Sequence, residues 1–463
     1  MRNPNDSTDL AILGAGAAGM MAALCAARRG LSVMLFDPHF SHPNNLSVSG
    51  GLFPAAGSRL QAGAGVADQP RRWLDDLRLF AGDSVNQRIA PAIAESLPRL
   101  VDFLVDQCAA PIRFLADVVG PGHSVTRFHS VEPASGRGLH AWLRRVVQDT
   151  PAIESITDMP IDAVTRSPSG FSLEWAAPAY RVRARHLLLA GGGFGGNPAM
   201  VARFIPEMTG ALHSGAATND GSVIALATQW GAALAGMDGY QGQGHANPGG
   251  KTRLGMSLPT MGAVMLNRDG LRFVREDLGP SALAAHVLAQ PGQVALEVFD
   301  QHIEEQLGNH SAYLDARAAG HIMVADAVPE LAGLTGVPAA RIEQALHDTA
   351  RYAAGIDTDP LGRRGFARIM HPPYRASWVT GALAHTQGGV VTDERARVLD
   401  TEHRAIPFLY AAGGCAAGLS GHGGDGYLPG NGLAQSFGLA WLAVEAIAET
   451  TGAPARTINP LSS

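Results

Sequence analysis

Cysteine and lysine are nearly absent from this chain. Its three cysteines, Cys25, Cys108 and Cys415, are isolated, so they form no CxxC metal or redox pair and indicate no disulfide framework. A reducing compartment, the cytoplasm, is therefore predicted. Lys251 is the only lysine, and a Walker phosphate loop around it fails because the first glycine of that motif would fall on His245.

Charge is also scarce, at 16% of the residues, and 35 basic residues face 41 acidic ones. The net charge of −6 gives no basic surface for nucleic acid, so that partner is excluded. An uncharged run over residues 10–27 is just long enough to span a bilayer. Three glycines interrupt it at turn spacing, and Asp6 and Asp9 stand where a signal peptide carries positive charge. No integral membrane segment is predicted.

Residues 9–37 have the pattern of a dinucleotide-binding unit. The strand DLAIL leads into the turn GAGAAG and the helix MMAALCAARRG, and a second strand, LSVMLF, ends on Asp37. Gly14 allows the turn, Gly16 lets the backbone approach a pyrophosphate, and Gly19 lets helix and strand pack closely. The helix N-terminus would face the phosphates, and Asp37 would accept hydrogen bonds from a ribose hydroxyl.

A second glycine cluster, HLLLAGGGFGGN, also fits GxGxxG formally. The residues after it lead to no strand that ends in an acid at the right distance, so a separate nicotinamide site is disfavoured. We expect this segment to return to the first nucleotide instead.

Length and composition indicate an α/β enzyme with more than one domain. At 463 residues the chain exceeds one typical core, and its 56 glycines suit many tight loops. Residues 236–370 differ from the rest in their Gly- and Met-rich loops, and strand signals resume from residue 374. An inserted second domain over this stretch is therefore predicted.

Seven motifs, in this order, resemble the FAD-binding flavoproteins that include the soluble fumarate reductases and 3-ketosteroid dehydrogenases. The motifs are GAGAAG, SVSGGLFPAAG, LLLAGGGFGGN, MLNRDGLRFVRE, HTQGGVV, LYAAGG and YLPGNGL. The resemblance implies an α/β fold with a Rossmann-like FAD-binding domain, discontinuous over 1–235 and 371–463, and an inserted α+β capping domain over 236–370. It places the substrate between the cap and the flavin.

The resemblance also implies which residues contact FAD. The turn in YLPGNGL would direct a helix N-terminus at the flavin, where the helix dipole stabilises negative charge on the reduced ring. Asn44 stands where succinate dehydrogenase relatives carry the flavin-linking histidine, so FAD is predicted to be non-covalent, and Gly414 replaces the acid usual in the family. The FAD residues implied are Gly14, Ala15, Gly16, Gly19, Asp37, Ser49, Gly50, Gly51, Gly57, Ala190, Gly191, Asp220, Gly414, Gly430, Asn431, Gly432 and Leu433.

The proton relay of the fumarate reductases is missing at the aligned positions. Pro280 stands where those enzymes have a proton-donating arginine and where ketosteroid dehydrogenases have a tyrosine. Met256 and Pro259 stand where the relay has glutamate and arginine. Because Met and Pro side chains transfer no proton, fumarate reduction by the usual mechanism is disfavoured.

Four side chains are candidates for substrate chemistry. Tyr427, where fumarate reductases carry a carboxylate-binding arginine, would polarise a substrate carbonyl, or else pack on the flavin with its hydroxyl bonded to backbone. His385 resembles a substrate-binding histidine of the fumarate reductases; the alternative is a loop histidine that holds a strand turn. His245 lies near the first substrate histidine of that family, in an open register. Arg375 is either an anion clamp or a solvated arginine.

These residues predict an FAD-dependent oxidoreductase acting on a CH–CH bond beside a carbonyl of a small-molecule substrate, similar to a ketosteroid dehydrogenase, with hydride transfer at flavin N5. One alternative is a fumarate-reductase-like enzyme of small carboxylates. Another is a flavin-binding electron-transfer or partner subunit without substrate chemistry of its own. No metal site, haem motif or iron–sulfur pattern is present in the sequence, so an external electron donor or acceptor is expected.

Overall fold

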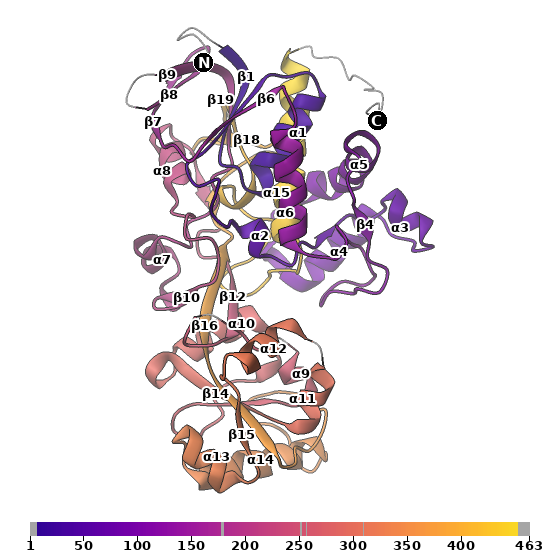
Figure 1. Ribbon diagram of the computed structural model, residues 1–463, viewed down its shortest axis with the longest axis vertical. Coiled ribbons are helices and arrows are strands. Elements are labelled where there is room, and N and C mark those ends of the chain that lie inside the picture. The colour runs from indigo at the N-terminus through magenta and orange to yellow at the C-terminus, as the bar shows by residue number, and fades with distance from the viewer. Residues whose placement is uncertain (1–6, 177–179, 251, 256, 309, 452–463) are drawn as a thin grey trace. The chain divides into compact units, whose positions relative to one another are not determined.

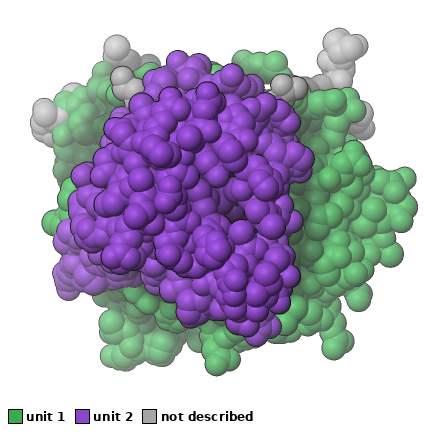
Figure 2. Space-filling model, turned by 90° about the horizontal axis from the view of Figure 1, so that it is seen from below, with its two compact units in different colours: residues 1–200, 215–239, 385–463 green, residues 201–214, 240–384 purple. Residues whose placement is uncertain are grey.

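The computed structural model describes residues 7–176, 180–250, 252–255, 257–308 and 310–451 (Figure 1). The chain forms two compact units, which Figure 2 shows in different colours. The first unit comprises Met1–Met200, Gly215–Gly239 and His385–Ser463, and the second comprises Val201–Ser214 and Tyr240–Ala384. Both units are therefore discontinuous in sequence. Among the described residues, no helix has the length and hydropathy needed to cross a membrane.

A largely parallel sheet forms the centre of the first unit. Its strands run in the order β18-β19-β9-β1-β2-β6, and β7 and β8 form an antiparallel extension beside β9. Buried apolar runs lie at its centre, LAIL in β1, VMLF in β2 and LLL at the end of β9, as expected for parallel strands covered on both faces. Their bounds are β1 (Ser7–Leu13), β2 (Val33–Asp37), β6 (Ile153–Thr157), β7 (Ile161–Ser167), β8 (Gly170–Trp175), β9 (Tyr180–Leu189), β18 (Arg397–Leu399) and β19 (Ala405–Ala411).

Helices of the first unit pack on one another, some of them through faces rich in small residues. Helix α1 (Ala17–Arg28) is buried from Ala18 to Ala26 and contacts both α15 (Asn431–Thr451) and α6 (Gly136–Gln148) (Figure 1). Helix α15 also packs on α5 (Ala90–Cys108), where a Cβ on Gly438 would lie 2.7 Å from Ile93. The other elements are α2 (Asn45–Val48), β3 (Phe53–Pro54), α3 (Arg59–Gly63), α4 (Pro70–Ala81), η1 (Gly82–Ser84), β4 (Arg113–Phe114), β5 (Phe128–Ser130), α8 (Ser222–Gln229), β11 (Leu234–Ala235), β17 (Gly389–Val390) and η5 (Gly413–Cys415).

The second unit is a mostly antiparallel sheet with helices, which confirms the predicted α+β class. The path β10-β16-β14-β13 is joined by β12 and β15, both of which pair with β16. Alternate residues of β14 enter two hydrophobic clusters, Ala295 and Phe299 in one and Leu296 and Val298 in the other, so apolar side chains cover both faces. The strands are β10 (Leu212–His213), β12 (Tyr240–Ala246), β13 (Val264–Leu266), β14 (Val294–Asp300), β15 (Met323–Ala325) and β16 (Tyr374–Thr386).

The helices of the second unit connect these strands. They are α9 (Leu258–Met261), α10 (Pro280–Leu288), α11 (Gln301–Leu307), α12 (Ser311–Ala318), α13 (Val328–Thr335) and α14 (Ala339–Ala353), with the short turns η2 (Pro206–Met208), η3 (Glu276–Leu278) and η4 (Pro291–Gln293). Helix α7 (Pro198–Phe204) spans the point where the chain first passes from one unit to the other.

The second compact unit has different bounds from the insertion predicted over 236–370. The cause is β16, which pairs with β14 from Tyr374 to Thr380, so the chain stays in the second unit as far as Ala384. The same strand pairs with β10 at Leu212↔Ala382, which brings 201–214 into the second unit as well. Of the strands that follow residue 374, only β16 therefore belongs to the second unit, as far as Ala384, whereas β17, β18 and β19 belong to the first. Sequence periodicity alone does not tell which sheet a strand joins.

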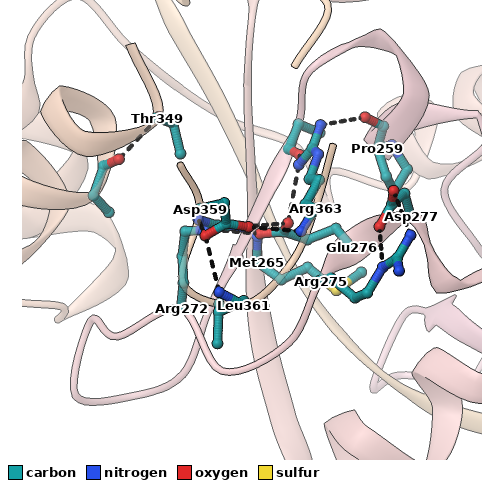
Figure 3. Close-up of polar contacts among 12 residues, drawn as sticks. Pro259, Met265, Arg272, Arg275, Glu276, Asp277, Thr349, Asp359, Leu361 and Arg363 are labelled. Carbon is teal, nitrogen blue, oxygen red and sulfur yellow. Dashed lines mark hydrogen bonds and ion pairs between the residues drawn. The ribbon is translucent and has the colours of Figure 1, made fainter. Parts of the chain in front are cut away.

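A buried charge network joins the RFVRE segment of the second unit to residues 359–363 (Figure 3). Arg272 donates to both oxygens of Glu276 at 2.8 Å and to both oxygens of Asp359 at 3.0 and 3.1 Å. Arg363 donates to Glu276 Oε2 at 3.0 Å and to backbone carbonyls of Pro259 and Ala263. Two guanidinium groups thus balance two carboxylates, all of them buried.

We expect Arg363→Met to destabilise the protein by about 3–5 kcal/mol, because removal of one cation leaves an uncompensated buried negative charge. The neighbouring Arg364 is exposed, so Arg364→Met is the matched control and should change stability by no more than about 0.5 kcal/mol. Urea unfolding followed by circular dichroism compares the two variants. Equal unfolding midpoints would show that the network contributes nothing to stability.

Candidate functional site

The GAGAAG turn connects β1 to α1 at the carboxyl end of the parallel strands. Gly14 has a φ of +106°, and a Cβ there would lie 2.5 Å from the carbonyl oxygen of Ala190. A Cβ on Gly19 would lie 1.8 Å from the carbonyl oxygen of Gly14. These two positions therefore accept only glycine. A Cβ on Gly16 would meet no described atom within 4 Å, so the turn leaves open space at that position, just before the start of α1.

Asp37 ends β2 and bonds the glycine turn directly. Its Oδ2 accepts the N–H of Ala15 at 2.6 Å, and its Oδ1 accepts the N–H of His39 at 2.7 Å. The sequence predicted a ribose contact for this acid but not its bond to the turn. Each carboxylate oxygen can accept more than one hydrogen bond, so holding the turn and binding a ribose hydroxyl are compatible roles.

The second glycine cluster lies against the first. A Cβ added to Gly14 would meet the backbone of Ala190 and Gly191, and a Cβ on Gly191 would lie 2.7 Å from Val223 of α8. Asp220 is exposed just before α8, where its Oδ1 accepts the N–H of Ser222 at 2.9 Å. A Cβ on Gly414 would lie 2.9 Å from the amide nitrogen of Gly193, so an acid at that position needs the backbone to shift.

The SVSGGLFPAAG segment begins beside the same turn. Asn44 caps α2, with its Oδ1 accepting the N–H of Ser47 at 3.0 Å, and its Nδ2 donates to Ala15 O at 3.5 Å. Ser49 Oγ accepts the N–H of Gly51 at 3.1 Å. Gly51 has a φ of +71°, and a Cβ there would lie within 2.6 Å of the Ser135–Gly136 backbone. The two remaining glycines of this segment, Gly50 and Gly57, are less crowded, because a Cβ on either would have no neighbour nearer than 3.4 Å.

The N-terminus of α15 brings the best catalytic candidates together. Gly430 has a φ of +89° before the helix, and buried Asn431 donates from Nδ2 to Ser420 Oγ at 3.1 Å. A Cβ on Gly432 would lie 3.3 Å from both His385 Nε2 and Tyr427 Oη. The two side chains therefore meet over the first turn of α15, next to Leu433 in the sequence.

The His385 and Tyr427 rings pack edge to face with centroids 5.1 Å apart. The Tyr427 oxygen accepts the N–H of Gly432 at 3.4 Å, a contact that does not use the phenol proton. Burial raises the pKa of Tyr427 to about 12 and lowers the pKa of His385, so the phenol keeps its proton and the imidazole is neutral at pH 7. His385 Nδ1 lies 3.3 Å from the carbonyl of Thr386, which favours a proton on Nδ1 and leaves Nε2 as an acceptor.

His245 lies in the second unit, where sequence analysis missed its partner. Its Nδ1 is 2.9 Å from Oε2 of Glu297, and both side chains are fully buried. The one signal for Glu297 was an acid in the middle of the otherwise apolar run VALEVF. His245 therefore belongs to a different unit from His385 and Tyr427.

Arg375 is buried, so the interpretation of a solvated arginine is wrong. Only 8% of this residue is exposed, since β16 places it opposite Phe299 inside the sheet. Its Nε donates to Glu304 Oε2 at 2.6 Å, and Tyr313 donates to the other oxygen of Glu304 at 2.7 Å. The guanidinium thus already pairs with a carboxylate of its own unit.

The aligned relay positions carry no titratable side chain. Pro280 is the first residue of α10, and Pro259 lies in α9, where its carbonyl accepts a bond from Arg363 at 2.5 Å. Met256 lies outside the described residues. Within the described part of the chain, no group of three or more His, Cys, Asp or Glu side chains is arranged to hold a metal ion.

A parallel sheet with a glycine turn after its first strand and an acid at the end of its second is the arrangement of a dinucleotide-binding fold. The chain belongs to the FAD binding domain family, whose model matches residues 9–433. It is an FAD-dependent oxidoreductase of the fumarate reductase and ketosteroid dehydrogenase group, acting on CH–CH bonds. The open space at Gly16, beside a helix N-terminus and a carboxylate, fits this cofactor.

Similar proteins of both kinds are known. The chain is 28% identical over 433 residues to a fumarate reductase (cytochrome) of Shewanella frigidimarina, with 90% of this chain and 73% of that protein covered. It is 26% identical to a 3-oxosteroid 1-dehydrogenase of Mycobacterium tuberculosis, with 96% and 99% covered. The open conformation of a flavocytochrome c3 fumarate reductase has a similar structure, with a TM-score of 0.82, 26% identity, and 96% of this chain and 78% of that chain covered.

Proposed function

We propose that this enzyme dehydrogenates a C–C bond adjacent to a carbonyl in a fairly apolar ketone, in the manner of a ketosteroid dehydrogenase. The observation that carries the proposal is the meeting of Tyr427 Oη and His385 Nε2 over Gly432, at the N-terminus of α15. A neutral phenol and a neutral imidazole suit an uncharged carbonyl better than a carboxylate, which binds most strongly to cations.

Each group at this site has a role in the proposal. FAD, when bound, exchanges a hydride with the substrate. The Tyr427 hydroxyl donates a hydrogen bond to the substrate carbonyl, which makes the neighbouring C–H more acidic. His385 Nε2 accepts a hydrogen bond or a proton, and the N-terminus of α15 stabilises negative charge that develops nearby.

The departures from the fumarate reductase pattern support the same choice. Pro259 and Pro280 transfer no proton, and Arg375 already pairs with Glu304. A reductase or dehydrogenase of small carboxylates that uses Arg375 and His385 is the second candidate, favoured by the similarity to the Shewanella enzyme. A flavin-binding electron-transfer or partner subunit is the remaining alternative, and the experiment below tests all three.

The first unit binds FAD through the residues of the glycine turns, and the second unit acts as the cap over a small-molecule substrate. Electrons leave to an external acceptor or come from an external donor. The isolated cysteines favour a reducing compartment, the cytoplasm.

We expect FAD to be bound without a covalent link. Asn44, at the position of the linking histidine, carries no ring nitrogen for a flavin bond, and its side chain is used to cap α2. Acid precipitation of the purified protein should therefore release all of the flavin into the supernatant. A yellow pellet would contradict this prediction.

Anaerobic titration of the FAD-loaded enzyme tests the function. Bleaching of the flavin band at about 450 nm by a saturated 3-ketosteroid would support the ketone dehydrogenase. Bleaching by small saturated carboxylates alone would favour the second candidate. If neither class of substrate reduces the flavin but an external electron donor does, the result would support the electron-transfer subunit. Because substrate reduces FAD directly in this assay, the physiological acceptor need not be known.

A further inference from the structure

Arg127 lies at the centre of a buried polar network in the first unit. Its Nη1 donates to Asp76 Oδ2 at 2.5 Å, and its Nε donates to Asp68 Oδ2 at 3.0 Å. The guanidinium group and the Asp68 carboxylate are completely buried, and the Asp76 side chain is nearly so. The same Nη1 lies 3.2 Å from Nδ1 of His123, and the other nitrogen of that ring lies 2.9 Å from the carbonyl oxygen of Pro429. The network therefore reaches the turn that precedes α15.

The neighbours of His123 allow only one protonation state of its ring. A guanidinium group only donates hydrogen bonds, so Nδ1 accepts the bond from Arg127 and carries no proton. Nε2 faces a carbonyl, which only accepts, so Nε2 carries the proton and donates a hydrogen bond to Pro429. Burial, together with the charge of Arg127, lowers the pKa of His123, so the ring is neutral at pH 7, as this tautomer requires. His123 thus connects a fixed guanidinium group to one backbone carbonyl.

A fixed Pro429 carbonyl also fixes the direction of the next N–H, that of Gly430. The peptide bond between the two residues is planar and trans, so the N–H of Gly430 points away from His123. The bond from Ala434 N–H to the Gly430 carbonyl, at 3.0 Å, closes the first turn of α15, so the Gly430 N–H stands just outside the helix. Among the described residues, no acceptor bonds this N–H. It is therefore a free donor at the positive end of the helix dipole.

The same network reaches a second segment that is predicted to bind FAD. Gln61 is completely buried, and its Nε2 donates to Asp68 Oδ2 at 3.0 Å. Its Oε1 accepts the N–H of Gly57 at 2.7 Å, and the backbone carbonyl of Arg127 accepts the N–H of Ala55 at 3.1 Å. Two segments remote in sequence, one in SVSGGLFPAAG and one in YLPGNGL, are thus held by one buried cluster.

Packing alone does not require polar groups at this place. The His123 ring packs edge to face on Phe128 with centroids 4.8 Å apart, a contact that an apolar side chain could make as well. Apolar residues of similar volume in place of a buried ion pair often leave a protein as stable or more stable. The direction that the network imposes on the backbone explains its polar groups better than stability does.

We propose that His123 is a positioning residue of the FAD site: Arg127 orients its ring, and the ring holds the Pro429–Gly430 peptide so that the Gly430 N–H stays free to bond the flavin. A free N–H at a helix N-terminus stabilises negative charge, and reduced flavin carries more of it than oxidised flavin, so the bond favours the reduced cofactor. This inference rests on the part of the proposed function that assigns the N-terminus of α15 to the flavin. Its test uses no substrate, so the inference and the proposed substrate class are refuted by different results.

The reduction potential of bound FAD, measured by anaerobic reduction against a reference dye, tests the proposal in two variants of similar size. His123→Met removes the donor, so the Pro429 carbonyl is no longer held. We expect the affinity for reduced FAD to fall about tenfold more than the affinity for oxidised FAD, which lowers the potential of this two-electron couple by about 30 mV. His123→Gln keeps a side-chain N–H for Pro429 and should hold the ratio of the two affinities within about twofold of the wild type.

His186→Met is the matched control, the same change at another buried histidine of the first unit. His186 lies on β9, where its ring packs against Phe408 and Tyr410 and takes no part in the network. We expect the wild-type potential in this variant even if its melting temperature falls, because lost packing alone does not change the donors at the flavin. Equal potentials in His123→Met and His186→Met would overturn the proposal. A potential as low in His123→Gln as in His123→Met would overturn it too.

Gly432→Ala separates a failure of this inference from a failure of the FAD assignment. A Cβ at Gly432 would lie in the first turn of α15, 3.3 Å from both His385 and Tyr427, and should weaken FAD binding if the flavin lies against this turn. Weaker binding in Gly432→Ala with an unchanged potential in His123→Met would refute the role of His123 and leave the flavin site in place. Normal binding in the first variant and a normal potential in the second would refute both.

A further readout needs no redox chemistry. NMR of the FAD-loaded protein labelled with 15N-histidine reports the tautomer of His123, whose signals are assigned by their absence in His123→Gln. We expect a slowly exchanging proton on Nε2 and none on Nδ1 at pH 7. A proton on Nδ1, alone or in a doubly protonated ring, would overturn the proposal, because the ring would then accept no hydrogen bond from Arg127 at that nitrogen.

Discussion

A Gly16→Ala variant is expected to fold and to lose most of its affinity for FAD. A Cβ on Gly16 would contact no described protein atom within 4 Å, so the substitution does not obstruct the turn itself. It would project into the space where the backbone must approach the pyrophosphate. The loss of one or two hydrogen bonds to the charged phosphates is worth about 2–3 kcal/mol, or roughly a 30- to 150-fold rise in Kd.

Flavin fluorescence during titration of the apoprotein measures this affinity, and two other glycines serve as references. Gly63→Ala lies in α3 with no atom within 4 Å of its Cβ and should bind FAD normally. Gly19→Ala should fail to fold, because its Cβ would lie 1.8 Å from Gly14 O. If Gly16→Ala bound FAD as tightly as Gly63→Ala, the turn would not be the phosphate site.

Tyr427→Phe is expected to slow flavin reduction by a ketone substrate about 100- to 1,000-fold while FAD stays bound. The variant removes only the hydroxyl that would polarise the carbonyl, and loss of one such donor typically has this effect. Burial raises the pKa of Tyr427 to about 12, so the donating proton is present at any pH well below that value and is lost only as the pH rises through it. Tyrosine ionisation should therefore not limit the wild-type rate between about pH 6 and 10.

Anaerobic stopped-flow absorbance gives the reduction rate, and Tyr410→Phe is the control. Tyr410 is a buried tyrosine of β19, in the same unit but outside the turn at α15. Its loss of a hydroxyl should leave the rate within about twofold. A Tyr427→Phe enzyme as fast as Tyr410→Phe would mean that the ring only packs, as the alternative interpretation of this residue supposes.

The sequence predicted the nucleotide-binding part of the fold because its signals are local. Strand, turn, helix and acid follow one another within 9–37, and steric demands at Gly14 and Gly19 leave few other arrangements. The predicted insertion and the second compact unit end at different residues, because an apolar strand such as β16 looks the same whichever sheet it joins. Its partner β14 is remote in sequence, and pairing between remote strands leaves no local mark.

Long-range polar partners escaped prediction for the same reason. Glu297 and His245 are brought together only by the sheet of the second unit, and Glu304 meets Arg375 only because α11 follows β14. His385 and Tyr427 were found through their motifs, but their contact over Gly432 depends on where β16 ends and where α15 begins. Residue types could thus be predicted from the sequence, whereas their partners required the fold.

The order of the segments along the chain has a consequence for biosynthesis. Every residue of the second unit is translated before β19 and α15, which complete the sheet and the candidate site of the first. Domains generally fold as units while the chain emerges, so the inserted unit can be finished while the sheet around β9 still has an open edge. That edge is a place for mispairing until β19 arrives. FAD supplied during expression should then raise the yield of folded protein, because it binds the completed chains. The FAD content of a preparation would then report the fraction of chains that finished translation and folding.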